Sequence, residues 1–252
     1  MVPRAKAFLL EAREIQLAAH RAGLPGDEVA KLRSDAIDIV IDALYLRAGP
    51  AAASLTLVAT GGYGRAELCP LSDIDLLVLV PAHTAETKQA VETILYPLWD
   101  VGLKVGQSVR TVAEAADYAR NDLHLHVALL ETRLLCGERS QFAQLEVRLS
   151  ELLSGEAWQP LAKAIVESQR KRREKAGGSA YLQEPDLKNG VGALRDVQGC
   201  VWLARIARGV AGLGAAGFLP VGDLQKFEQA KATLLRLRCE LHFQVTRPTE
   251  QL

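Results

Sequence analysis

The chain has 252 residues, 49% of them hydrophobic, and its 30 lysines and arginines balance its 30 aspartates and glutamates. This length allows one large domain or two small ones with a sizeable core. The formal net charge of zero excludes a global basic field of the kind that attracts nucleic acid. No apolar run approaches the roughly 20 residues of a membrane-spanning helix. From the charge balance we expect no nucleic-acid partner, and from the short apolar runs we expect no membrane partner.

The four cysteines lie far apart in the chain and form no metal-ligand spacing. We interpret them as reduced thiols of a cytoplasmic protein. We also expect no signal peptide, because charged residues interrupt every apolar stretch near the N-terminus. These residues are Arg4, Lys6, Glu11, Arg13 and Glu14.

The first half of the chain changes from a helical to a strand-like pattern. Two amphipathic helices are predicted at residues 3–22 and 27–48, because Gly23-Leu-Pro-Gly26 interrupts the apolar periodicity. The central part then predicts strands near 55–60, 74–80 and 103–110, with a helix from about 84 to 100.

The second half reads as helices. Thr111-Val-Ala-Glu114 is a capping box, which marks the start of a helix directly after the third strand. Helices are predicted at 112–120, 122–135, 139–153, 157–175, 194–210 and 221–246. The pattern predicts an α+β fold, in which a small mixed β-sheet flanked by helices is followed by an all-helical region. The expected domains are the N-terminal helices 1–50, the sheet-containing core 51–120 and the helical domain 121–252.

Two acidic side chains open the second predicted strand. Asp73-Ile-Asp75 leads into the apolar run Leu76–Val80. Because positions i and i+2 of a strand point to the same face, Asp73 and Asp75 can present two carboxylates side by side. Such a pair suits Mg²⁺, which binds through one or two carboxylates together with substrate phosphates.

A glycine turn precedes this acidic pair. Gly61-Gly62 directly follows the first predicted strand, and ten residues separate Gly62 from Asp73. Backbone N–H groups of such a loop can hold a triphosphate while the carboxylates hold the metal. Taken alone, an Asp-x-Asp pair is usually a solvated strand end, and Gly-Gly is usually a turn. Their combination predicts a site for phosphoryl chemistry.

A second motif lies in the helical half: Glu184-Pro-Asp-Leu-Lys-Asn-Gly-Val-Gly-Ala-Leu-Arg-Asp-Val-Gln198. Together with Gly61-Gly-Tyr-Gly-Arg-Ala-Glu-Leu68 and Ser72-Asp-Ile-Asp-Leu-Leu77, it resembles the N-terminal nucleotidyltransferase region of the bacterial PII-protein uridylyltransferases, the uridylyltransferase/uridylyl-removing enzymes. This family belongs to the DNA polymerase β-like nucleotidyltransferase superfamily. The segments Leu98–Thr111 and Leu129–Gly137 also look like this family, and the resemblance covers roughly residues 55 to 247. The glutamine synthetase adenylyltransferases share the pattern more distantly.

The resemblance implies a polymerase β-like core and transfer of a nucleoside monophosphate to a hydroxyl by two-metal-ion catalysis. It implies that Asp73 and Asp75 hold Mg²⁺ (or Mn²⁺), that Gly61 and Gly62 place the triphosphate, and that the donor is UTP. The implied acceptor is a tyrosine of the nitrogen-signalling PII protein. The residues themselves select neither uracil nor tyrosine.

Four further residues are candidates for nucleotide binding. By resemblance, Lys188 and Arg195 lie near the nucleotide; alternatively, Arg195 pairs with Asp196 and caps the helix 194–210. Arg65 either meets a phosphate or pairs with Glu67. Ser72 either caps the turn before Asp73 or touches the metal shell.

The basic run Arg170–Lys175 is interpreted as a solvated helix end that is favoured by the helix dipole. The alternative is that one or two of its arginines reach the nucleotide phosphates.

Two positions depart from the family pattern. Lys104 stands in Leu-Lys-Val-Gly-Gln where many members read Leu-Glu-Val-Gly-His. It therefore occupies the place expected for a third metal-binding carboxylate, and Glu131 is the candidate for that carboxylate in its stead. Ala193 replaces a usual glycine, a change that is tolerable unless the backbone needs a positive φ. Three functions therefore stay open: a uridylyltransferase, a nucleotidyltransferase with another nucleotide or acceptor, and an inactive nucleotide-binding regulatory module.

Complete members of the family continue into a metal-dependent phosphohydrolase domain that carries a His-Asp pair. No His-Asp dipeptide occurs in this sequence. We therefore expect the chain to be part of a longer protein, truncated at the C-terminus relative to the family, and to lack the uridylyl-removing activity.

Overall fold

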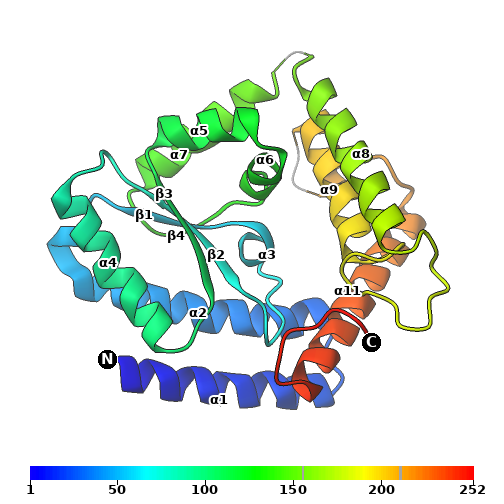
Figure 1. Ribbon diagram of the computed structural model, residues 1–252, viewed down its shortest axis with the longest axis horizontal. Helices are drawn as coiled ribbons and strands as arrows, with labels where there is room; N and C mark the ends of the chain where they lie inside the picture. Colours follow the sequence, from blue (N-terminus) through cyan, green and yellow to red (C-terminus); the bar gives the residue numbers. More distant parts are fainter. Residues whose placement is uncertain (155, 210–211) are drawn as a thin grey trace. The chain divides into compact units, whose positions relative to one another are not determined.

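The computed structural model describes residues 1–154, 156–209 and 212–252 (Figure 1). These residues divide into two compact units. Unit 1 comprises Met1–Ala19 and Ala30–Leu149, and unit 2 comprises His20–Val29 and Ser150–Leu252. Across the described ranges, no helix combines the length and the apolar character needed to cross a membrane. All four cysteines are free thiols.

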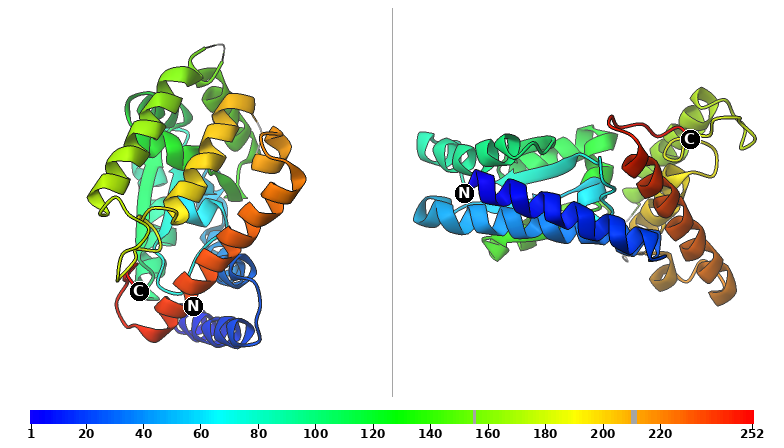
Figure 2. Two further views of the ribbon diagram at one scale, coloured as in Figure 1. Left: turned by 90° about the vertical axis from the view of Figure 1, so that its right-hand side faces the viewer. Right: turned by 90° about the horizontal axis from the view of Figure 1, so that it is seen from below.

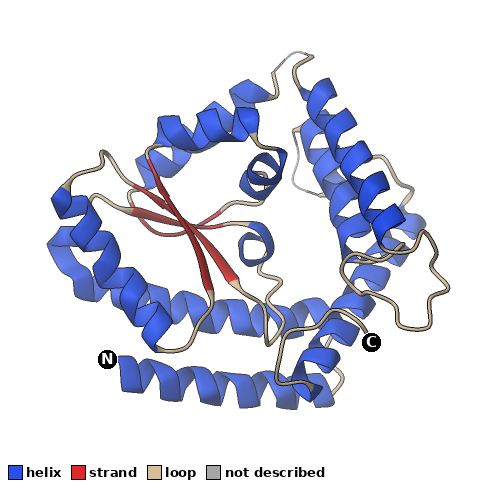
Figure 3. Ribbon diagram, in the orientation of Figure 1, coloured by secondary structure: helices blue, strands red, loops and turns tan. Residues whose placement is uncertain are grey.

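Unit 1 is built on a mixed four-stranded sheet with the order β3-β2-β1-β4 (Figure 3). Strand β1 pairs antiparallel with both β2 and β4, whereas β2 and β3 run parallel. The strands are β1 Thr56–Ala59, β2 Ile74–Leu79, β3 Val105–Arg110 and β4 Arg133–Gly137. Together with the helical region of unit 2, this sheet confirms the predicted α+β class.

Helices cover the sheet, and the central strands β1 and β2 are buried on both faces except at Asp75. Alternate strand residues, among them Leu57, Ile74 and Val78, form a core with Ile37 and Ile94 of the covering helices. Helix α1 lies alongside α2 (Figures 1 and 2) and adds its own apolar side chains to this core. The helices are α1 Val2–Arg21, α2 Gly26–Ala48, the 3-10 turn η1 Gly49–Ala52, α3 Gly61–Gly64, α4 Ala85–Asp100, α5 Val112–Asn121, α6 Leu123–Leu129 and α7 Arg139–Leu152.

In its described residues, unit 2 is built from helices, with one isolated β-bridge between Asp186 and Gln251. Helix α8 packs along α9, and α10 and α11 complete the group. The segment that joins α1 to α2 belongs to this unit, since Arg236 of α11 donates a hydrogen bond to the carbonyl of Leu24 at 2.7 Å. The helices are α8 Trp158–Lys175, α9 Leu194–Arg208, α10 Leu213–Ala216 and α11 Val221–Gln244.

Several predicted helix ends differ from the structure, and the helix predicted at 221–246, for example, ends at Gln244. The prediction of a helix at 122–135 is wrong beyond Leu129, where α6 ends and a turn leads into β4. The apolar run of β4 has no helical or strand period of its own, and backbone pairing of Arg133 with Ala59 of β1 decides its conformation. The helix predicted at 194–210 ends at Arg208, with left-handed Gly209 as its C-cap at φ 68°. Residue 210 lies outside the described residues.

The capping box at the start of α5 is confirmed. The hydroxyl oxygen of Thr111 accepts a hydrogen bond from the N–H of Glu114 at 3.2 Å, and the carboxylate of Glu114 accepts one from the N–H of Thr111 at 2.8 Å. These bonds satisfy donors that the first turn of a helix would otherwise leave unpaired, so the helix begins where the motif predicts.

Candidate active site

The two predicted carboxylates lie at the start of β2. Asp73 directly precedes this strand and Asp75 is its second residue, and both side chains are exposed whereas Ile74 between them is fully buried. The alternation places the two carboxylates on the same side of the strand. Strand β3 runs beside them, and the carbonyl of Lys104 accepts a hydrogen bond from the N–H of Ile74 at 2.9 Å.

The glycine loop leaves β1 and forms the single turn α3, which lies next to this acidic pair. Gly61 adopts φ +55°, a left-handed conformation that glycine reaches without strain, and a methyl group built on it would lie 3.5 Å from Oδ2 of Asp75. The N–H of Thr60 donates to the backbone carbonyl of Asp75 at 3.0 Å. The side chain of Thr60 makes no capping hydrogen bond to α3. The backbone of the loop therefore lies beside the carboxylate of Asp75.

Gly106 of β3 is a site residue that sequence reasoning missed. It stands in register with Asp75, and a methyl group built on it would lie only 2.6 Å from Oδ1 of that side chain. The carboxylate of Asp75 thus uses the space that any larger residue at 106 would fill. The available signal was a glycine in the middle of a strand pattern, which often marks a close approach of another group.

Arg65 forms the ion pair with Glu67 that was the alternative to a phosphate contact. Its Nε donates to Glu67 at 2.5 Å, and its Nη1 donates to Glu131, the candidate third carboxylate, which lies in the turn after α6. Burial opposes the charge of the guanidinium, but Glu131 and Glu67 outweigh it and raise the pKa of Arg65. Ser72 lies in the turn before Asp73, where its N–H donates to the carbonyl of Cys69 at 2.9 Å.

A second polar group that sequence reasoning missed lies under the glycine loop. The buried hydroxyl of Tyr63 donates to Oδ1 of Asp38 at 2.6 Å, and Arg133 binds the same carboxylate through both terminal nitrogens, at 2.6 and 3.1 Å. Burial, followed by the charge of Asp38, raises the pKa of Tyr63. This group had no sequence signal, because Asp38, Tyr63 and Arg133 come from three distant parts of the chain.

The two predicted cations of unit 2 lie together. Lys188 and Arg195 are joined by a backbone hydrogen bond of 2.9 Å from the N–H of Arg195 to the carbonyl of Lys188. The ammonium group of Lys188 lies 3.8 Å from Glu250. The guanidinium of Arg195 donates to Gln198 at 3.0 Å and stands 5.7 Å from the ring centroid of Trp202. These cations thus occupy the loop and first turn that lead into α9.

The neighbouring basic run is largely engaged with acidic and backbone partners. Asp196 accepts hydrogen bonds from Arg172, from Nε of Arg173 at 3.0 Å and from the N–H of Gly192 at 2.8 Å. Arg170 pairs with glutamates of its own helix, at 2.8 and 2.6 Å. Ala193 has φ −82°, so its methyl group causes no backbone strain.

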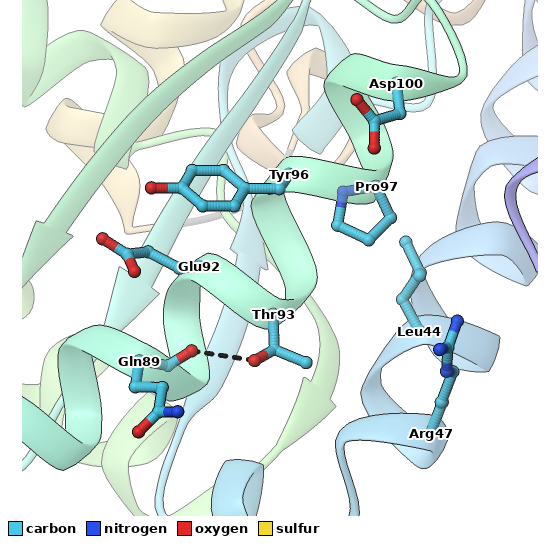
Figure 4. Close-up of a pocket in the computed structure, with 8 residues that line it drawn as sticks. All are labelled: Leu44, Arg47, Gln89, Glu92, Thr93, Tyr96, Pro97 and Asp100. Atoms are coloured by element: carbon cyan, nitrogen blue, oxygen red, sulfur yellow. Dashed lines mark hydrogen bonds between the residues drawn. The ribbon is translucent and has the colours of Figure 1, made fainter.

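A separate cavity of about 360 Å³ lies between α2 and α4 (Figure 4). Its walls include Tyr96 and Thr93, and the hydroxyl of Thr93 donates to the backbone carbonyl of Gln89 at 2.9 Å. The lining residues are Leu44, Arg47, Gln89, Glu92, Thr93, Tyr96, Pro97 and Asp100. None of the predicted site residues lines this cavity.

Two family models match overlapping parts of the chain. Residues 49–172 match the model of the nucleotidyltransferase domain, and this range contains the glycine loop and the acidic pair of unit 1. Residues 161–252 match the model described as GlnD PII-uridylyltransferase, and this range contains Lys188 and Arg195.

Relatives with a curated name are similar over most of the chain. A protein of Bradyrhizobium sp. (strain ORS 278), named bifunctional uridylyltransferase/uridylyl-removing enzyme, is 37% identical over 254 residues, which cover 98% of this chain and 27% of the relative. A protein of the same name from Rhodospirillum rubrum is 40% identical over 202 residues, or 79% of this chain and 22% of the relative. The chain thus spans about a quarter of the length of the relatives that it matches. It carries a nucleotidyltransferase domain followed by a region of the GlnD PII-uridylyltransferase family.

Proposed function

We propose that this chain transfers UMP from UTP to a hydroxyl group, and that the acceptor is a tyrosine of the PII signalling protein. The observation that carries the proposal is the position of the Asp75 carboxylate beside Gly61, inside the range that matches the nucleotidyltransferase domain. The names of the relatives support UTP as the donor, and the GlnD model supports PII as the acceptor. The four free thiols suit the reducing cytoplasm, where we place the reaction.

The residues at the start of β2 fit a divalent metal. Asp73 and Asp75 offer exposed oxygen donors on one side of the strand, and Mg²⁺ or Mn²⁺ bound there would complete its coordination with phosphate oxygens. When bound, such ions stabilise the attacking and the leaving oxygens of an in-line displacement.

The chain's own groups would then align the substrate. The acceptor hydroxyl releases its proton to solvent, its oxygen forms a bond to the α-phosphorus, the bond between this phosphorus and the oxygen that bridges it to the β-phosphate breaks, and pyrophosphate leaves. Backbone N–H groups of Gly61 and Gly62 would hold the triphosphate. Lys188 and Arg195 would neutralise the charge that develops on the pyrophosphate. Arg65 would act on the phosphates through the loop, since its guanidinium binds Glu67 and Glu131.

A second candidate function follows from the third strand. Lys104 directly precedes β3, and its carbonyl accepts a hydrogen bond from the N–H of Ile74, so a cationic residue stands next to the start of β2 where the family pattern has a carboxylate. A chain that binds nucleotide but does not transfer it would be a regulatory module.

One assay separates these functions. The protein is incubated with Mg²⁺, each labelled nucleoside triphosphate in turn, and PII from the same organism, with an EDTA-treated sample as the control. Metal-dependent labelling of PII by UTP alone is the expected result. Labelling by another nucleotide, or of another acceptor, would give the chain a different transferase specificity. Tight binding without any transfer would establish the regulatory module and refute the proposal.

A further inference from the structure

The glycine loop has little structure of its own. Helix α3 is a single turn of four residues, three of which are glycines, and it is closed by backbone hydrogen bonds such as that from the N–H of Glu67 to the carbonyl of Gly62 at 2.9 Å. A turn this short is only marginally stable by itself, so the contacts of Tyr63 and of Arg65, its C-cap, add to what holds it in place.

One short segment, Glu131–Arg133, binds both of these residues. Glu131 receives the guanidinium of Arg65, and Arg133 binds the backbone carbonyl of Tyr63 at 3.3 Å while it also binds Asp38, the partner of the Tyr63 hydroxyl. The segment also supports the loop by direct packing. A methyl group on Gly64 would lie 1.7 Å from the carbonyl oxygen of Glu131, so the two backbones touch.

The group formed by Asp38, Tyr63 and Arg133 is geometrically stiff. Arg133 grips the carboxylate of Asp38 through two parallel hydrogen bonds, and the Tyr63 hydroxyl shares one of the same oxygens. A bidentate pair of this kind fixes the orientation as well as the distance of its members. Because Tyr63 follows Gly61 and Gly62 in a single turn, the group sets where these glycines stand relative to Asp75.

We propose that Asp38 and Arg133 are positioning residues, which act through Tyr63 to hold Gly61 and Gly62 at the triphosphate site beside Asp75. Neither residue touches the reacting atoms. The expected effect of these residues on UTP binding rests on the proposed function. Their expected effect on the conformation of the loop does not depend on any ligand.

The test compares Arg133→Gln and Arg133→Lys with Ile41→Val, a matched control. Ile41 is fully buried in α2, three residues after Asp38, and the loss of one methylene there lowers stability while every hydrogen bond of the Asp38–Tyr63–Arg133 group keeps its partners. Amide hydrogen exchange of residues 61–67 is measured first, at a temperature where every variant is folded. We expect these amides to exchange roughly tenfold faster in Arg133→Gln, which is the scale of one lost charged hydrogen bond. The exchange rate should return part of the way to that of the unchanged chain in Arg133→Lys, and it should not change in Ile41→Val.

The second measurement is the KM for UTP and the kcat of transfer. A displaced loop should raise KM roughly tenfold in Arg133→Gln, whereas a loss of folded protein alone would lower the apparent kcat and leave KM unchanged. If Arg133→Gln does not fold, Tyr63→Phe, which keeps the Arg133–Asp38 pair, replaces it in the comparison. Tyr63→Phe should also raise the loop exchange rate and the KM for UTP. Loop exchange equal to that of Ile41→Val would overturn the inference. If the unchanged chain does not use UTP, the proposed function fails, and the exchange comparison still decides whether this group holds the loop.

Discussion

Gly106→Ala should separate catalysis from stability. The backbone of Gly106 is in an ordinary strand conformation, since its φ is not positive, and the residue is exposed. Alanine therefore fits the backbone, and because it restricts the unfolded chain it should keep or raise the free energy of unfolding by about 0.4–1 kcal/mol. The new methyl group meets the end of a flexible side chain, the carboxylate of Asp75.

The size of the effect follows from that contact. The methyl carbon would lie 2.6 Å from Oδ1 of Asp75, whereas ordinary contact begins near 3.4 Å, so the carboxylate must move by at least about 0.8 Å. A misplacement of about 1 Å at a catalytic group can reduce a rate by roughly a hundredfold. We therefore expect Gly106→Ala to lower the rate of UMP transfer by about ten- to a hundredfold, with weaker Mn²⁺ binding.

The assay measures transfer from labelled UTP at saturating acceptor, together with thermal unfolding and Mn²⁺ titration. Gly222→Ala in α11 is the matched control, because a methyl group there meets no atom within 4 Å and φ is again not positive. Full transfer with unchanged Mn²⁺ affinity in Gly106→Ala would refute the assignment of Asp75 to the metal. A large loss of stability would refute the argument from the strand geometry.

Three further predictions use four other substitutions. Asp75→Asn keeps the shape of the side chain, so transfer should fall by at least about a hundredfold with little change in melting temperature, and intact activity would make the carboxylate structural. Arg195→Ala and Lys188→Ala should each weaken UTP binding by about 1.5–3 kcal/mol, an effect that shrinks at high salt in a titration series; unchanged affinity in both would confine the nucleotide site to unit 1. Burial, followed by the charge of Arg238, lowers the pKa of His242 to about 4. Since the unfolded histidine binds its proton near pH 6.5, acidification from about pH 6.5 to 4 should lower the free energy of unfolding by roughly 3 kcal/mol through this residue. Denaturant titrations should find a smaller decrease in His242→Gln, and an equal decrease would exclude His242 as the cause.

Local patterns predicted most of the elements that frame the site. The period of two around Asp73 and Asp75, the glycine turn and the Thr111 capping box each act within a few residues, so a single sequence contains them. The glutamates that bind Arg65 illustrate the limit: Glu67 is near in sequence and was anticipated, whereas the bond to Glu131 depends on how the chain returns to the sheet.

Strand β4 escaped prediction for the same reason. Its short apolar run Leu134–Cys136 suits a helix as well as a strand, and backbone pairing with β1 decides between them. The requirement at Gly106 was also hidden, because the carboxylate that fills its space comes from the neighbouring strand.

The late position of β4 in the chain has a consequence for how the site assembles. Ala59 and Arg133 pair across the whole length of chain that contains the glycine loop, the acidic strand and α4 to α6. Closing so long a loop is slow and costs entropy, so the loop beside Asp75 should acquire its fixed shape only in the last stage of folding. A shortened core that stops before Arg133 would keep Gly61, Gly62, Asp73 and Asp75 and still lack the strand whose pairing with β1 completes the sheet beside them.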